Sequence, residues 1–282
     1  MATGERGVLY PARLPQFHRL PASSAARDLV GWFWIPEWDI EPGRSSRQHV
    51  VGYPALNLVV ESAVEPTGEP AAVTLSGATS RASFRDLSGT GWAVGALLRP
   101  AAVAALTDAP ADLVDTGIEI AAPGLAGDVA AAMASDVGHR ERAATVVSDW
   151  LVRRVGALDS SAHQSNRVVD LLMAEDGPDT VEEIARRVSV SMRTLQRITH
   201  RHVGLSPAAM LRRRRLQRAA ERLRQDADLD IADLAASLGY ADHAHLTRDF
   251  RRNLGVVPRA YRAAADRSEA FDGLSAARHE DG

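Results

Sequence analysis

The chain has 282 residues, a length that suits two domains. It contains no cysteine, which excludes disulfides, thiolate metal sites and cysteine nucleophiles. All 33 basic residues are arginine, and the absence of lysine excludes P-loop nucleotide binding and Schiff-base chemistry. We therefore expect the chain not to be an enzyme.

The net charge of −3 hides an asymmetry between the two halves. Residues 1–164 carry 13 Arg against 18 Asp and Glu, whereas residues 165–265 carry 18 Arg against 13. The last segment, 266–282, is acidic again, with 2 Arg against 5 acids. A basic half indicates contact with a polyanion, although a solvated helical surface gives the same count.

Short apolar runs separated by Pro and Gly fill the first 120 residues, which also hold four of the five Trp. This pattern is typical of a β-rich domain. The predicted strands lie within residues 29–35, 50–60, 71–75 and 92–98.

Aromatic side chains on these strands are candidates for an effector pocket, with core packing as the alternative. The candidates are Trp32, Trp34, Tyr53 and Trp92, and Trp38 belongs to the same group. The histidines of this half are isolated in the sequence, so we predict no metal and no cofactor. They are His18, His49, His139 and His163.

Residues 125–155 change to a helical pattern, with apolar residues three and four apart. These helices either form a dimer interface, with Trp150 and Leu151 as anchors, or pack on the β-rich domain. We take 1–156 as an effector-binding and dimerisation domain, 157–165 as a linker and 265–282 as a disordered tail. Without a secretory signal or a long apolar segment, a cytoplasmic location is expected, with no membrane contact.

The carboxy-terminal half contains an internal repeat with an offset of 50 residues, which becomes 51 after one insertion. Each copy predicts a short helix, a tight turn, a second helix and a Gly-x-x-Pro stop. Ser191 and Asp242 are the expected N-caps of the second helices. This is the helix-turn-helix pattern, whose second helix enters the major groove of DNA.

Residues 166–264 closely resemble the DNA-binding domain of AraC/XylS-type transcription regulators. The resemblance rests on the motifs at 184–185, 191–197, 204–207, 215–219, 231–235, 239–242, 246–252 and 255–262. Thr199 and Leu246 depart from the family, which has aromatic residues there, and we expect both changes to affect packing. Arg215 matches the family's Arg-Leu signature, and we expect it to make an internal ion pair.

The DNA-facing residues are expected on one face of each second helix. Arg193, Gln196 and Arg197 lie at i, i+3 and i+4, and arginine and glutamine can read guanine and adenine. The long helix that joins the two units offers Arg212 and Arg213 for phosphate contacts. The remaining candidates are Thr194, His243, Ala244, Thr247, Arg248 and Arg251. Because Ala244 offers only apolar contact, we expect the second unit to be the less selective reader.

The resemblance implies an α+β two-domain protein. An amino-terminal β-rich, cupin-like domain with helices would precede an all-α double helix-turn-helix domain. The implied function is sequence-specific transcription regulation, with activation as one mode, controlled by a small-molecule effector in the amino-terminal domain. Expected partners are double-stranded DNA, the effector, a second copy of the chain and RNA polymerase. The alternative is a ligand-independent regulator whose amino-terminal domain only dimerises.

Overall fold

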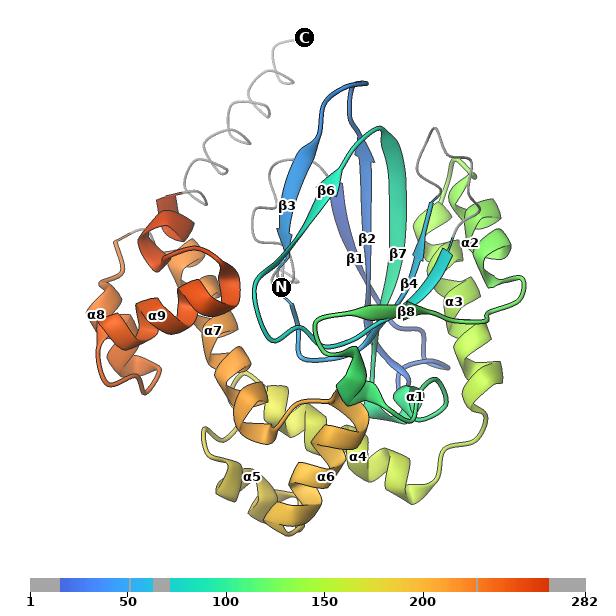
Figure 1. Ribbon diagram of the computed structural model, residues 1–282. Helices are drawn as coiled ribbons and strands as arrows, with labels where there is room; N and C mark the ends of the chain where they lie inside the picture. The colour runs from blue at the N-terminus through green and yellow to red at the C-terminus, as the bar shows by residue number, and fades with distance from the viewer. Residues whose placement is uncertain (1–15, 51, 63–71, 227, 264–282) are drawn as a thin grey trace.

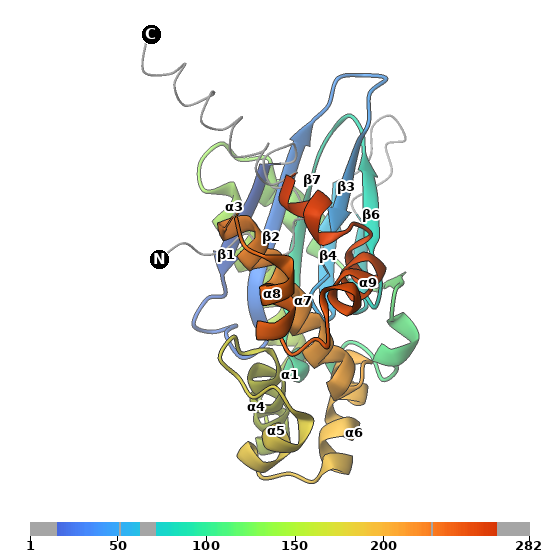
Figure 2. The same ribbon diagram turned by 90° about the vertical axis from the view of Figure 1, so that its left-hand side faces the viewer.

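The computed structural model describes residues 16–50, 52–62, 72–226 and 228–263. Strands dominate the amino-terminal part, and helices alone make up the described carboxy-terminal part (Figures 1 and 2). The predicted α+β two-domain class is therefore confirmed, whereas the predicted tail, 265–282, lies outside the described residues. The likeness to cupins stays a prediction.

The strands form a six-stranded antiparallel sheet and a separate two-stranded ribbon. The sheet has the order β1-β2-β7-β4-β5-β8, and the ribbon pairs β3 with β6. Their bounds are β1 Gln16–Pro21, β2 Val30–Asp39, β3 Ser46–Val50, β4 Asn57–Glu61, β5 Ala72–Ser76, β6 Ser83–Leu87, β7 Thr90–Leu98 and β8 Gly117–Glu119.

Alternation along the central strands separates the two faces of the sheet. Phe33 and Ile35 of β2 are fully buried on the face that packs against helices, whereas Trp32 and Trp34 point to the other face. Each fully buried side chain of this size contributes about 1.5–3 kcal/mol to folding. The core of the amino-terminal part thus lies between the sheet and its helices, and the opposite face remains available for a cavity.

Helices α2 (Leu125–Met133) and α3 (His139–Val155) cover this apolar face, as Figure 1 shows on the right. Leu151 is fully buried and Trp150 is partly buried against the same core. The burial of these two side chains favours packing on the sheet over their predicted role as dimer anchors.

A polar cluster fastens α3 to the sheet. The carboxylate of Glu37 accepts hydrogen bonds from Arg140 and from His139 Nε2, the latter at 3.1 Å. Burial alone would raise the pKa of Glu37, but these bonds outweigh it and lower the pKa. In the part of the chain that the structure describes, no three His, Asp or Glu side chains gather closely enough to hold a metal ion.

The two parts of the chain are joined by helix α4 (Ser160–Met173), which packs on α1 (Pro100–Val103). Because α4 begins at Ser160, most of the predicted linker, 157–165, is helical. Asn166 is almost completely buried; its Oδ1 accepts from the Ala101 N–H at 3.0 Å and its Nδ2 donates to the Asp28 carbonyl at 2.8 Å. Buried polar groups satisfied in this way fix the relative position of α4 and the sheet.

The remaining helices build two compact units connected by one long helix (Figure 2). Among the described residues, none of the helices is long and apolar enough to span a bilayer. The bounds are η1 Pro110–Leu113, a 3-10 turn, and α5 Val181–Arg187, α6 Met192–Val203, α7 Pro207–Gln225, α8 Ile231–Ser237 and α9 His243–Leu254.

Candidate nucleic-acid interface and effector cavity

The first unit consists of α5 and α6, joined by a tight turn. Ser189 adopts a positive φ of 55° in this turn, and the Ser191 hydroxyl caps α6 by accepting from the Thr194 N–H at 3.1 Å. Leu195 and Ile198 are buried, as their spacing predicts. The predicted turn and N-cap are confirmed.

The second unit repeats this arrangement with α8 and α9. Gly239 supplies the positive φ of 73°, and the Asp242 carboxylate accepts from the His245 N–H at 2.6 Å. Helices α5 and α8 have seven residues each, and α6 and α9 have twelve each. The repeat found in the sequence is therefore a repeat in structure.

The predicted DNA-facing residues of the first unit lie on the solvent side of α6. Arg193, Gln196 and Arg197 are exposed, and Thr194 is half-buried with its hydroxyl 3.0 Å from Ser191 Oγ. This places three long side chains with hydrogen-bonding ends on one free face.

The corresponding face of α9 differs in depth. His243, Arg248 and Arg251 are exposed, whereas Ala244 and Thr247 are half-buried. On α9, the longer and exposed side chains therefore surround two short side chains that lie closer to the helix. Contact with bases remains a prediction for both helices.

The four consecutive arginines of α7 divide between surface and interior. Arg212 is exposed, with its Nε 3.8 Å from Asp249 Oδ2, and its contact with phosphate stays a prediction. The prediction that Arg213 contacts phosphate is wrong, because its side chain is buried and bonded inside the protein. Its Nη2 donates to the carbonyl and hydroxyl oxygens of Thr79, each at 2.7 Å, and its Nη1 donates to the Asn253 carbonyl at 3.2 Å.

The Arg213 guanidinium thus joins three segments: α7, the carboxy-terminal end of α9 and the loop after β5. Burial lowers its pKa to about 10, and it stays protonated at neutral pH. A charge that bonds to several carbonyl oxygens fixes their positions.

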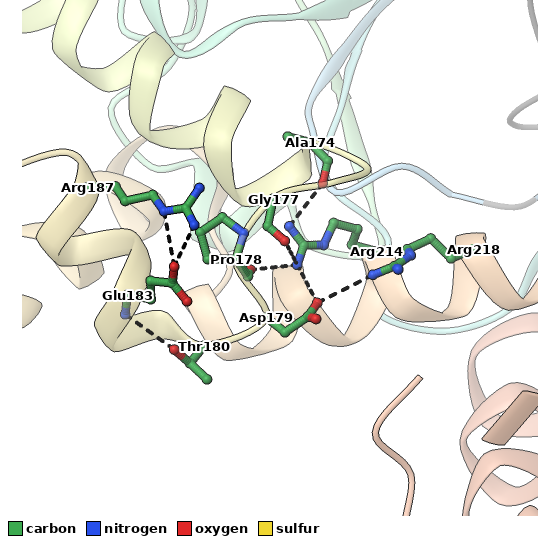
Figure 3. Close-up of polar contacts among 9 residues, drawn as sticks. All are labelled: Ala174, Gly177, Pro178, Asp179, Thr180, Glu183, Arg187, Arg214 and Arg218. Carbon is green, nitrogen blue, oxygen red and sulfur yellow. Dashed lines mark hydrogen bonds and ion pairs between the residues drawn. The ribbon is translucent and has the colours of Figure 1, made fainter. Parts of the chain in front are cut away.

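Arg214 has a second structural role, which Figure 3 shows. Its guanidinium is buried and donates to the carbonyl oxygens of Ala174, Gly177 and Pro178 at 3.0, 3.3 and 2.6 Å, and to Asp179 Oδ1 at 2.9 Å. These carbonyls end α4 and lead into α5. Arg214 therefore fixes the first unit to the long helix.

Arg215 contacts the second unit instead. Its guanidinium lies 5.6 Å from the ring centroid of Tyr240, whose hydroxyl donates to Asp249 at 3.1 Å. Among the described residues, its contact is therefore with an aromatic ring in place of the expected ion pair. Desolvation, with Asp249 nearby, raises the pKa of Tyr240.

The two departures from the family pattern are both packing positions. Thr199 and Leu246 are fully buried, and the Thr199 hydroxyl donates to the Gln196 carbonyl at 3.2 Å. The hydroxyl is satisfied within its own helix, so the smaller side chain leaves no unpaired polar group.

A cavity of about 540 Å³ lies between the sheet and the β3–β6 ribbon. Trp32, Trp34 and Tyr53 line it, as proposed from the sequence, and Trp38 lines it as well. Trp92 does not belong to this set, because it packs against the core on the helix side. Since Ala93 and Leu97 line the cavity, the alternation along β7 turns Trp92 away, a signal already present in the sequence.

Comparison with known proteins agrees with this geometry. Residues 184–264 match a family described as helix-turn-helix domain, and residues 9–119 match a domain of unknown function. The HTH-type transcriptional activator RhaS of Escherichia fergusonii is 41% identical over 87 residues, which cover 31% of this chain and 31% of that protein. RhaS of Klebsiella pneumoniae is 38% identical over 85 residues, 30% of each chain.

Among solved structures, a transcriptional regulator from Chromobacterium violaceum with an AraC-type DNA-binding domain is 27% identical. That match covers 37% of this chain and 94% of the other, with a TM-score of 0.34.

The duplicated capped helix pairs and the family match of residues 184–264 define the carboxy-terminal part as a double helix-turn-helix DNA-binding domain. Within that class, the RhaS relatives support the resemblance of this domain to those of AraC/XylS-type regulators.

Proposed function

We propose that the chain is a sequence-specific transcription regulator that reads DNA with α6 and α9. The observation that carries this proposal is the repeated unit itself, with exposed arginines on the same face of both second helices. Two such helices on one continuous α7 suit adjacent major-groove segments about 10 bp apart. The name of the RhaS relatives supports activation as its mode, and a homodimer and contact with RNA polymerase belong to the same proposal.

The second part of the proposal is control by a small molecule in the cavity. Thr79 lines the cavity and also accepts both 2.7 Å hydrogen bonds from Arg213, which in turn donates to Asn253 of α9. A ligand that moves the Thr79 loop would therefore change the position of α9. The change in DNA affinity equals, at most, the difference in ligand affinity between the two states.

Selection of bound duplexes from a random pool, with the full chain at about 150 mM salt, tests DNA reading. Two enriched boxes about one turn apart are expected. A variant with Arg197→Ala and Arg248→Ala serves as control and should enrich neither box. Enrichment of no sequence by the unmodified protein, with and without added small molecules, would contradict the proposal.

A thermal-shift screen of small molecules, followed by DNA-binding assays, tests effector control. A compound that raises Tm and changes DNA affinity supports control. If compounds from many classes leave Tm unchanged, the ligand-independent regulator becomes the better reading.

A further inference from the structure

The cavity has an unusual floor, made by two indole rings that lie flat on a neighbouring strand. In the pairing of β2 with β7, Trp34 stands opposite Gly95 and Trp38 opposite Gly91. A Cβ at Gly95 would lie 2.0 Å from the Trp34 ring, and one at Gly91 would lie 2.6 Å from the Trp38 ring. Only glycine permits this approach, so each indole covers strand backbone and presents its other side toward the cavity.

Hydrogen bonds hold both rings in place. Trp34 Nε1 donates to Asn57 Oδ1 at 2.9 Å, and Trp38 Nε1 donates to the Ser88 carbonyl at 3.2 Å. Because both N–H groups are already bonded within the protein, the floor offers ring faces rather than donors. A rigid ring face favours stacking with another flat ring.

The charged side chains around the cavity limit the charge of an occupant. Within the described lining they are Glu61, Arg85 and Asp115, which together carry one net negative charge. Arg85 already pairs with Glu61. Asp115 accepts from the backbone N–H and the hydroxyl of Ser80, at 2.7 and 2.5 Å, and its Oδ2 lies 3.7 Å from Arg81 Nε. A bound anion would have to compete with Glu61 for Arg85 or with Asp115 for Arg81, whereas a cation would be attracted by the ring faces.

We propose that the cavity binds a flat aromatic molecule that carries no negative charge, stacked over Trp34 and Trp38. The volume of about 540 Å³ is within the range of small-molecule sites and admits a molecule of two or three fused rings. This inference deepens the proposed function. It rests on that function in one respect, which is that the bound molecule is taken to be the effector.

Isothermal titration calorimetry with four matched probes on the full chain tests the ligand class. The probes are 2-naphthol, which is neutral, protonated 2-naphthylmethylamine, anionic 2-naphthoate and the saturated, non-planar decahydro-2-naphthol. We expect the first two to bind at least tenfold more tightly than the last two. Equal or tighter binding of the naphthoate or the saturated alcohol, or no binding of any probe, would overturn the proposal.

Two variants locate the binding site. Trp38→Leu removes one ring of the floor, and Gly95→Ala displaces the other; each is expected to weaken 2-naphthol binding at least tenfold. The matched control is Gly127→Ala on α2, where a Cβ meets no atom within 4 Å, and it should bind like the unmodified protein. If Trp38→Leu retains full affinity while its far-UV circular dichroism is unchanged, the rings do not form the site.

The same samples separate this inference from the proposed function. Binding of 2-naphthol without any change in DNA affinity would support the ligand class and contradict effector control. Selection of specific DNA together with failure of all four probes would leave DNA reading intact and overturn the ligand class.

Discussion

Helices α5 and α6 match α8 and α9 in length and capping, yet the two pairs are buried against different neighbours. The core of the first unit includes Ala78 from the amino-terminal part, with Tyr53 packed against it. Among the described residues, the core of the second unit draws only on 216–261. At Gly204, which ends α6, a Cβ would lie 2.6 Å from the Pro110 carbonyl of η1.

This difference shows how one repeated unit can acquire two mechanical roles. The first unit is joined to the amino-terminal part through apolar packing and, by way of α4, through the Asn166 hydrogen bonds. The second unit reaches that part through Arg213 and a close approach of Gly255 to Ala82. A change in the cavity would therefore displace the second unit more easily than the first.

The largest expected effect comes from the core of the second unit. Phe250→Ala should lower the free energy of unfolding by about 3–5 kcal/mol, because it removes a fully buried ring. Hydrogen exchange should show faster exchange confined to residues 216–261. The matched change Leu172→Ala, on α4 in the core that the first unit shares, should also expose the loop that contains Ala78. If faster exchange extended into the amino-terminal part equally in both variants, the core of the second unit would not be independent of that part.

Arg213→Ala breaks the connection between the second unit and the cavity loop. We expect a loss of about 2–4 kcal/mol in unfolding free energy, because buried carbonyls of Thr79 and Asn253 lose their donor. Urea denaturation measures this loss. The exposed neighbour is the control: Arg212→Ala should change stability by ~0.5 kcal/mol or less. Similar losses in both variants would place Arg213 at the surface.

These two arginines also show where the sequence was and was not sufficient. The caps Ser191 and Asp242 were predictable because capping depends on residues within three positions. The burial of Arg213 depends on a loop more than 130 residues away, which helical spacing does not reveal. A hint existed, because Arg213 lies three residues from both Met210 and Leu216 and shares their buried face.

The cavity, too, is predictable from the sequence only in part. Period-two alternation of β2 suffices to put Trp32, Trp34 and Trp38 on one face. The position of that face relative to the β3–β6 ribbon depends on strand order, β1-β2-β7-β4-β5-β8, which is set by long-range pairing. Aromatic content alone predicts Trp92 in the cavity, whereas the alternation along β7 places it on the helix side.

Substitutions on α6 should affect base reading, whereas substitutions on α7 should affect phosphate contact. Arg197→Ala should cost about 1–3 kcal/mol on the selected site and relax the base preference there. Arg212→Ala should weaken binding to all sequences and reduce the salt dependence of affinity. Fluorescence anisotropy on selected and scrambled duplexes at several salt concentrations distinguishes the two. Uniform weakening by Arg197→Ala would make that residue a phosphate contact.

The smallest expected effect is on pH dependence at the junction of the first unit. Burial is the main cause that lowers the pKa of His202, which lies 3.4 Å from Ser165 Oγ. Below about pH 6.5 the unfolded chain takes up a proton that the folded chain resists, so the free energy of unfolding falls as the pH falls. His202→Gln should reduce this decrease between pH 7.5 and 5.5, measured by urea denaturation. The exposed His200→Gln is the control and should keep it.

Helix α7 also fixes the rotation of the second unit relative to the first about the helix axis. Its 19 residues extend about 28 Å at 1.5 Å per residue, and Arg214 and Arg215 attach the two units near its middle. One inserted residue would turn the second unit by about 100° around the helix axis, whereas one added base pair turns its DNA site by about 35°. Because these two rotations differ, one inserted residue does not compensate for one inserted base pair. A DNA target bound by both units must therefore keep one fixed spacing between its two boxes.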